Sequence, residues 1–150
     1  MRVTSHVDIK APQQAVWTVV RDIENAAKNI QAIEKIEIIE RPKTGLIGLK
    51  WRETRTMFGK EATEVMWVTG AAEGSHYETR AESHGSIYTT RISLQGHDGG
   101  TRLRMDFEGK PVTVGAKVTW GLMGFMFKGA TRKALQKDLE DIKKKVEAQT

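Results

Sequence analysis

The sequence predicts an α+β domain in which a curved antiparallel sheet of about seven strands wraps around a long C-terminal helix, with a short broken helix after the first strand. The chain opens with one strand-like and one helical segment, continues with about six strand-like segments, and ends in a long amphipathic helical pattern. A run of strands between helices is typical of the α+β class and not of a parallel α/β sheet. The short, regular turns favour antiparallel neighbours.

The first strand is expected at residues 2–10, where apolar side chains alternate with polar ones. Pro12 suits the first turn of a helix, and apolar residues between 15 and 23 recur with helical spacing. Aspartate and asparagine at 22–25 offer new caps. We therefore expect this helix to bend or restart at residues 22–25.

Six further strands are expected between Ile33 and Pro111. They occupy, in chain order, residues 33–40, 49–58, 61–69, 76–83, 86–95 and 101–109. Turn-forming residues separate them, and the clearest signal is His97-Asp98-Gly99-Gly100, which is typical of a hairpin.

The C-terminal helix follows from apolar residues that recur every three or four positions, as Leu135, Leu139, Ile142 and Val146 do, with no breaker after Gly129. An antiparallel sheet of this length needs its apolar face covered, and this helix is the natural cover. If the sheet curls around the helix, a cavity forms between them.

The bulk properties indicate an ordinary soluble domain. The chain has 150 residues, enough for a substantial core, so residues 1–150 are treated as a single domain. There is no cysteine, and the first residues lack the apolar segment of a signal peptide. No stretch approaches the roughly 18 apolar residues that cross a bilayer. We therefore expect a cytoplasmic protein without stable membrane insertion.

Charge and motifs exclude several function classes. The net charge is +5, from 24 Lys and Arg against 19 Asp and Glu. Such a mild excess indicates solubility more than a partner, and no nucleic-acid motif is present, so we expect no nucleic-acid binding. The four histidines show no metal-ligand spacing. Neither a GxSxG elbow nor a phosphate-binding glycine loop occurs, and we expect no metal or cofactor.

The order of these segments resembles the START/SRPBCC superfamily, which has the helix-grip fold, and within it the polyketide cyclase/dehydrase and lipid-transport-like proteins. Four stretches carry the resemblance, which covers nearly the whole chain: VDIKAPQQAVWTVVRDIEN, GLKWRETRTMFGKEATEVMWVT, GGTRLRMDFEGKP and LQKDLEDIKKKVEA. It implies a deep cavity between the sheet and the last helix that holds an apolar or amphipathic small molecule. It implies no single activity, because members include lipid carriers, hormone receptors, cyclases and dioxygenase domains.

The most informative strand carries two charges on its apolar face. Trp51, Glu53, Arg55 and Met57 share one parity and hence one face of the sheet, and in such a fold this face would line the cavity. Glu53 and Arg55 should then pair, because a buried unpaired charge is costly, and Arg55 would orient a ligand carboxylate or phosphate. In the alternative interpretation the face is inverted, and the two residues form a weak surface pair.

Other strands contribute further candidates for the cavity wall, most of which should be ordinary core, and the start of the last helix adds more. Glu64 is an alternative partner for Arg55, and the Tyr77 and Tyr88 hydroxyls need partners if buried. The full predicted set of ligand-binding residues is Trp51, Glu53, Arg55, Met57, Glu64, Tyr77, Tyr88, Thr90, Met105, Phe107, Trp120, Met123 and Phe127.

Residues 119–129 combine six bulky apolar side chains with three glycines. Each glycine weakens a helix by about 1 kcal/mol, so the start of the last helix is expected to be loose. Three interpretations stay open: a mobile lid over the cavity, a transient membrane contact flanked by Lys117 and Lys128, and plain packing or a dimer contact. The chain is accordingly expected to be a monomer or a homodimer.

Three functions are compatible with these features. The favoured one is a carrier or binding protein for a small hydrophobic ligand, either lipid-like or aromatic. The second is a polyketide cyclase or dehydratase that uses a pocket acid or base such as Glu53, Arg55 or Tyr88. The third is a non-catalytic interaction module that assists a membrane-associated enzyme through residues 120–127. The lack of a catalytic motif favours binding over turnover.

Overall fold

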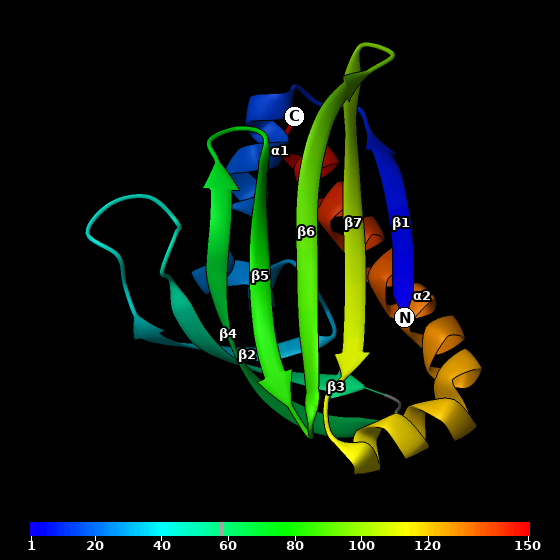
Figure 1. Cartoon of the computed structure of the whole chain (residues 1–150). Coiled ribbons are helices and arrows are strands. Elements are labelled where there is room, and N and C mark those ends of the chain that lie inside the picture. The colour runs from blue at the N-terminus through cyan, green and yellow to red at the C-terminus, as the bar shows by residue number, and fades with distance from the viewer. Residues whose placement is uncertain (58) are drawn as a thin grey trace.

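The structure is a computed structural model that describes residues 1–57 and 59–150. In that part of the chain the order of elements is the predicted one (Figure 1). The elements are β1 (Arg2–Ile9), α1 (Gln13–Val20), a 3₁₀ helix (Ile23–Lys28), β2 (Ile33–Glu40), β3 (Lys50–Met57), β4 (Lys60–Ala72), β5 (His76–Ser83), β6 (Ser86–His97), β7 (Gly100–Pro111) and α2 (Val114–Gln149). Phe58, the expected last residue of the third strand, lies outside the described residues.

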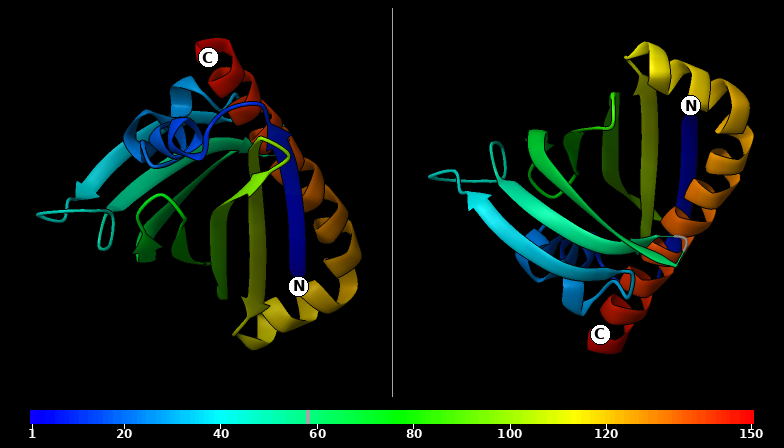
Figure 2. Two further views of the ribbon diagram at one scale, coloured as in Figure 1. Left: turned by 90° about the horizontal axis from the view of Figure 1, so that it is seen from above. Right: turned by 90° about the horizontal axis from the view of Figure 1, so that it is seen from below.

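The strands form one seven-stranded sheet in the order β1-β7-β6-β5-β4-β3-β2, and every neighbouring pair is antiparallel. The first strand therefore pairs with the last, and β2 forms the opposite edge. The two views in Figure 2 show the sheet curving around one side of α2. The predicted fold class, a curved antiparallel sheet with a long C-terminal helix, is confirmed.

Local sequence signals explain the ends of several elements. The hairpin predicted at residues 97–100 is confirmed. Its turn between β6 and β7 has two residues, Asp98 and Gly99, and both have positive φ, 48° and 81°. The predicted break after α1 is confirmed, because a 3₁₀ helix starts after Asp22. The Asp22 carboxylate does not cap that helix through its side chain; it accepts hydrogen bonds of 3.0 Å from the Asn25 side-chain amide.

Helix α2 begins with a side-chain cap, since the Thr113 hydroxyl accepts a hydrogen bond of 3.2 Å from the Ala116 backbone N–H. The helix then continues through Gly121, Gly124 and Gly129 without a break. Its first turns, yellow in Figure 1, lie at an angle to the orange and red remainder. The two halves of α2 therefore cover different parts of the sheet.

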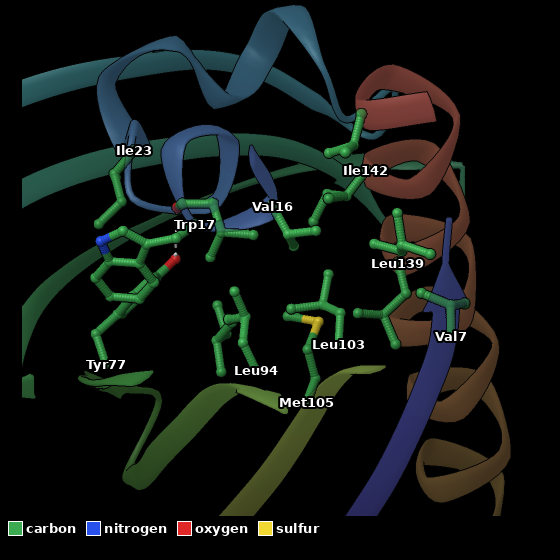
Figure 3. Packing of buried hydrophobic residues seen from close by; sticks show 14 of the residues in the cluster. Val7, Val16, Trp17, Ile23, Tyr77, Leu94, Leu103, Met105, Leu139 and Ile142 are labelled. Carbon is green, nitrogen blue, oxygen red and sulfur yellow. Dashed lines mark hydrogen bonds between the residues drawn. The ribbon is translucent and has the colours of Figure 1, made fainter. Parts of the chain in front are cut away.

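The solid core lies at the end of the sheet covered by α1 and the C-terminal half of α2 (Figure 3). Trp17, Leu103 and Leu139 are each 0% exposed there. Truncation of such a residue to alanine typically costs about 2–5 kcal/mol. This packing anchors the helix against the sheet and leaves the other end of the concave face free to enclose space.

Candidate functional site

A cavity of about 870 Å³ lies between α2, the inner face of strands β3 to β7, and the segment formed by the end of α1 and the 3₁₀ helix. Pockets that hold small molecules typically measure roughly 300–1,000 Å³, so the volume suits a ligand of moderate size. The cavity is a product of sheet curvature, because the sheet and α2 diverge beyond the solid core.

The structure brings together nearly all residues that the sequence singled out. Those that line the cavity are Trp51, Glu53, Arg55, Met57, Glu64, Tyr77, Tyr88, Thr90, Met105, Phe107, Trp120 and Phe127. Placing Met123 in the wall was wrong, since this side chain is 41% exposed and does not line the cavity. Trp120 and Phe127 lie two turns apart on the inner face of α2, and Met123 falls at the edge of that face.

The predicted orientation of β3 is confirmed. Trp51 and Glu53 are buried, whereas Arg52 and Thr56, which have the opposite parity, are exposed. The inverted-face interpretation, with Glu53 and Arg55 as a surface pair, is therefore excluded. Two charged side chains, those of Glu53 and Arg55, therefore lie on the inner face of β3, where they need partners.

A three-residue polar cluster occupies the wall where β3 approaches α2. The Arg55 guanidinium donates from Nε to Glu53 Oε2 at 3.1 Å and from Nη1 to Asp138 Oδ2 at 3.0 Å. Glu53 Oε1 also accepts from Trp51 Nε1 at 3.3 Å. The side chains of Asp138, Glu53 and Arg55 are 4%, 10% and 18% exposed, so each charge is held by its partners and not by water.

Burial and charge compete in setting the pKa values of this cluster. Burial disfavours the Arg55 cation, but Asp138 and Glu53 outweigh it, and the pKa of Arg55 is raised. Burial raises the pKa of Asp138, against the opposing effect of Arg55. Asp138 Oδ1 is buried and has no hydrogen-bond partner among the described residues. An acceptor of this kind is costly unless a donor reaches it.

Glu64 adds a second carboxyl group directly across from Glu53, since the two residues pair in the β3–β4 register. Burial and then the charge of Glu53 raise the pKa of Glu64, while His84 and Arg55 act in the opposite direction. Like charges on facing residues disfavour ionisation. In the described part of the chain Glu64 has no hydrogen bond or ion pair, so no partner there stabilises its ionised form directly.

Aromatic rings form the opposite part of the wall, near the start of α2. Tyr88 stacks on Phe107 with ring centroids 5.7 Å apart, and Trp120 lies 6.2 Å from Tyr88. The absence of a side chain at Gly109 permits this close packing of the rings. A Cβ at that position would lie 2.4 Å from Trp120 Cη2 and collide with it. At the core side, the Tyr77 hydroxyl donates to the Val20 carbonyl at 3.4 Å.

Among the ionisable side chains of the wall, sequence reasoning missed two, Asp138 and His84. A signal for Asp138 was present, because it lies three residues after Leu135 and four before Ile142, on the buried stripe of the helix. His84 was assigned to a turn, and it does lie in the β5–β6 turn with φ 49°. Nothing in the pattern indicated that this turn borders the cavity.

A second hollow of about 600 Å³ adjoins the first and shares Arg55, Met57, Ala134 and Asp138 with it. Lys133 and Lys137 contribute to its outer wall. The Arg55–Asp138 pair therefore stands between two hollows.

Within residues 1–57 and 59–150, no group of three or more His, Asp or Glu side chains could hold a metal ion. No helix within the same residues is both long and apolar enough to cross a membrane.

Comparisons with known proteins agree with this architecture. The family model described as polyketide cyclase / dehydrase and lipid transport matches residues 1–147. No curated protein matches the chain. Among solved structures, TTHA0849 from Thermus thermophilus superposes with a TM-score of 0.83 at 15% identity, covering 100% of this chain and 99% of its own.

Two further structures are similar over almost their whole length. A START superfamily protein from Mycobacterium smegmatis has a TM-score of 0.79 at 21% identity, with 99% of each chain covered. The aromatase/cyclase ZhuI from Streptomyces sp. R1128 has a TM-score of 0.76 at 17% identity, with 99% of this chain and 94% of ZhuI covered. At such identities the likeness shows the fold alone.

Proposed function

The chain belongs to the polyketide cyclase/dehydrase and lipid transport family, and from this premise we propose that it binds a small hydrophobic or amphipathic ligand in the cavity beneath α2. The observation that carries the proposal is the cavity of about 870 Å³, which has aromatic rings at one end and a hydrogen-bonded polar cluster at the other. A largely apolar pocket with a few fixed polar groups is the usual form of a small-molecule site.

The polar cluster indicates the chemistry of the ligand's head group. Arg55 is already engaged by Glu53 and Asp138, so the expectation that it orients a ligand carboxylate or phosphate loses support. Asp138 Oδ1 lacks a donor among the described residues, and Glu64 adds another carboxyl group to the wall. A ligand hydroxyl or phenol would supply that donor, whereas an anionic head would be repelled. We therefore expect a neutral, hydroxylated ligand.

The proposal is tested by native mass spectrometry of the freshly purified protein, followed by organic extraction. Thr90 lines the cavity, and its neighbour Thr89 on β6 is exposed. Thr90→Trp fills part of the cavity, while Thr89→Trp adds the same side chain on the outer face. We expect a discrete adduct, or uptake of a neutral fluorescent naphthylamine probe, with wild type and Thr89→Trp and not with Thr90→Trp.

Equal uptake by both tryptophan variants would place binding outside the cavity and sink the proposal. Absence of both adduct and probe uptake in the wild type would do the same. Circular dichroism confirms that each variant is folded before its binding is compared.

A second candidate function is proton transfer on a bound polyketide-like substrate. Glu64 favours it, because a half-buried carboxyl group with a raised pKa and no partner among the described residues suits a general acid or base. The aromatase/cyclase ZhuI, a structure similar to this chain, adds an analogy of fold. In such a dehydration Glu64 would protonate a departing hydroxyl, which leaves as water when its C–O bond breaks. The Glu64 carboxylate would then take the proton from the neighbouring carbon as the C=C bond forms.

The two candidates differ in what happens to the ligand. A carrier returns the extracted molecule unchanged after incubation, whereas a cyclase or dehydratase yields a product lighter by one water. For the enzyme we expect Glu64→Gln, and also Glu53→Gln and Arg55→Ala, to retain binding and lose turnover. Full turnover in all three variants would remove these residues from any mechanism.

A further inference from the structure

The start of α2 carries an unusual concentration of exposed apolar side chains. In the described part of the chain nine large apolar residues are exposed, and seven of them lie between residues 112 and 126. These seven, here called the apolar patch, are Val112, Val114, Val118, Leu122, Met123, Phe125 and Met126. Val114, Leu122 and Phe125 are 78%, 77% and 81% exposed. A contiguous exposed surface of this kind marks a binding face.

The patch is the outer face of a helix that is apolar on two sides. Val114, Val118, Leu122 and Phe125 follow each other at intervals of three or four residues and form one stripe. Trp120 and Phe127 on the same turns line the cavity. Packing against the protein therefore explains the inner face, but it leaves the outer stripe without a partner among the described residues. Plain packing, one of the three interpretations of this segment, does not account for the stripe.

The charges that flank the patch along the sequence, from residue 109 to residue 137, are all of one sign. Residues 109–137 contain six Lys and Arg and no Asp or Glu. Lys117, Lys128, Arg132 and Lys133 are exposed and form no ion pair within residues 1–57 and 59–150. Lys117 and Lys128 border the stripe, and Arg132 and Lys133 follow its last residue, Phe125, by about two turns. The surface is thus an apolar centre with an uncompensated basic border.

An apolar stripe with a basic border favours one kind of binding partner. A second copy of the chain in a symmetric dimer would bring the same four cations to the same interface, where they repel. An anionic lipid surface instead offers apolar depth for the stripe and negative charge for its border. We propose that the apolar patch docks on the surface of an anionic lipid bilayer, with the first turns of α2 lying in the plane of the interface.

Docking in this way brings the cavity wall to the lipid. Trp120 and Phe127 stand between the patch and the cavity on the same helical turns. This geometry holds whichever molecule occupies the cavity, so the proposal is independent of the proposed function.

The test is co-sedimentation of the full chain with vesicles of phosphatidylcholine, either alone or mixed with phosphatidylglycerol. Four basic residues near an anionic surface should strengthen binding at least about tenfold at low salt, since each contributes about 1 kcal/mol. Leu122→Ser combined with Phe125→Ser should lower binding to the anionic vesicles by about tenfold or more. Lys117→Gln combined with Lys128→Gln should weaken binding to these vesicles and leave the weak binding to phosphatidylcholine unchanged.

The chain offers a matched control in Ile39 and Ile47, which are exposed apolar residues far from α2 in the sequence, at 41% and 56%. Ile39→Ser combined with Ile47→Ser removes the same number of apolar side chains and should bind like the wild type. Three outcomes would overturn the proposal: no vesicle binding by the wild type, no preference for anionic vesicles, or equal loss in both double variants. Sedimentation velocity that shows a dimer abolished by Leu122→Ser and Phe125→Ser, without vesicle binding, would assign the patch to a second copy instead.

Discussion

Arg55 on β3 and Asp138 on α2 are joined by a hydrogen bond of 3.0 Å between Nη1 and Oδ2, across 83 residues of sequence. The Asp138 side chain is 4% exposed and that of Arg55 18%. Glu53 holds the same guanidinium from the other side. One cation therefore compensates two carboxylates, and it ties the cavity-lining part of the helix to the sheet.

Removal of this cation should be far more harmful than removal of a surface arginine. Arg55→Met leaves Glu53 and Asp138 buried without a counter-charge, which typically costs about 3–5 kcal/mol. Arg52→Met, three residues away, removes only an exposed ion pair with Glu37 and should cost less than about 1 kcal/mol. Urea unfolding of the two variants measures both values. Equal losses would mean that the cluster contributes no more than a surface pair.

The sequence predicted this site on β3 because period-two alternation alone decides which side chains share a face. Alternation placed Trp51, Glu53, Arg55 and Met57 on one face without knowledge of the rest of the fold. That this face lines the cavity was expected from the resemblance, and the structure places all four side chains in one wall. The pairing of Arg55 with Asp138 was beyond such reasoning, since it depends on how α2 is rotated and how far it slides along the sheet. The same rotation explains why Met123 was misplaced.

The order of the helices and strands was predictable because its signals also arise from residues that are close in the sequence. Turn chemistry at Asp98-Gly99 and a helical stripe through Leu139 and Ile142 are signals that neighbouring residues determine. Signals from neighbouring residues could not predict how the concave face divides into a solid core and an open cavity. This division follows from the divergence of α2 from the sheet, which the sequence showed only as glycines and apolar residues of unassigned role.

Gly109 should tolerate no side chain. A Cβ at this position would lie 2.4 Å from Trp120 Cη2 and 3.2 Å from the Tyr88 ring, so Gly109→Ala must displace the Trp120 indole. Overpacking of this kind costs about 1–3 kcal/mol. Gly96→Ala on the neighbouring strand β6 meets nothing within 4 Å and serves as the matched control. Urea unfolding, followed by tryptophan fluorescence, reports both stability and the ring environment; wild-type stability in Gly109→Ala would contradict the close packing.

Glu64 should make the stability of the protein depend on pH. Burial and the facing Glu53 raise the pKa of Glu64 in the folded protein, with His84 and Arg55 opposing, so the folded state binds this proton more tightly than the unfolded chain does. Protonation at Glu64 therefore favours folding, and this contribution is lost as the pH rises from the ordinary glutamate value of 4.5 through the raised pKa.

Glu64→Gln removes that titration. The free energy of unfolding of the variant minus that of the wild type should be constant below the ordinary pKa of glutamate and increase as the pH rises through the raised pKa. Urea unfolding at a series of pH values measures the difference. A difference that is flat with pH, or that falls, would show that the Glu64 carboxyl group ionises at least as readily in the folded protein as in the unfolded chain.

The glycines in the first half of α2 should control how fast ligand enters and leaves. Gly121 and Gly124 have open space where a Cβ would be added, so alanine fits at both positions and should stabilise the helix by up to about 1 kcal/mol each. If this half of α2 opens as a lid over the cavity, a more stable helix opens less often. Stopped-flow release of the naphthylamine probe should then slow in Gly121→Ala combined with Gly124→Ala, by about tenfold for every 1.4 kcal/mol gained. Gly96→Ala, outside the helix, should release the probe at the wild-type rate. A stabilised double variant that releases the probe at the wild-type rate would show that ligand reaches the cavity by a route other than the opening of α2.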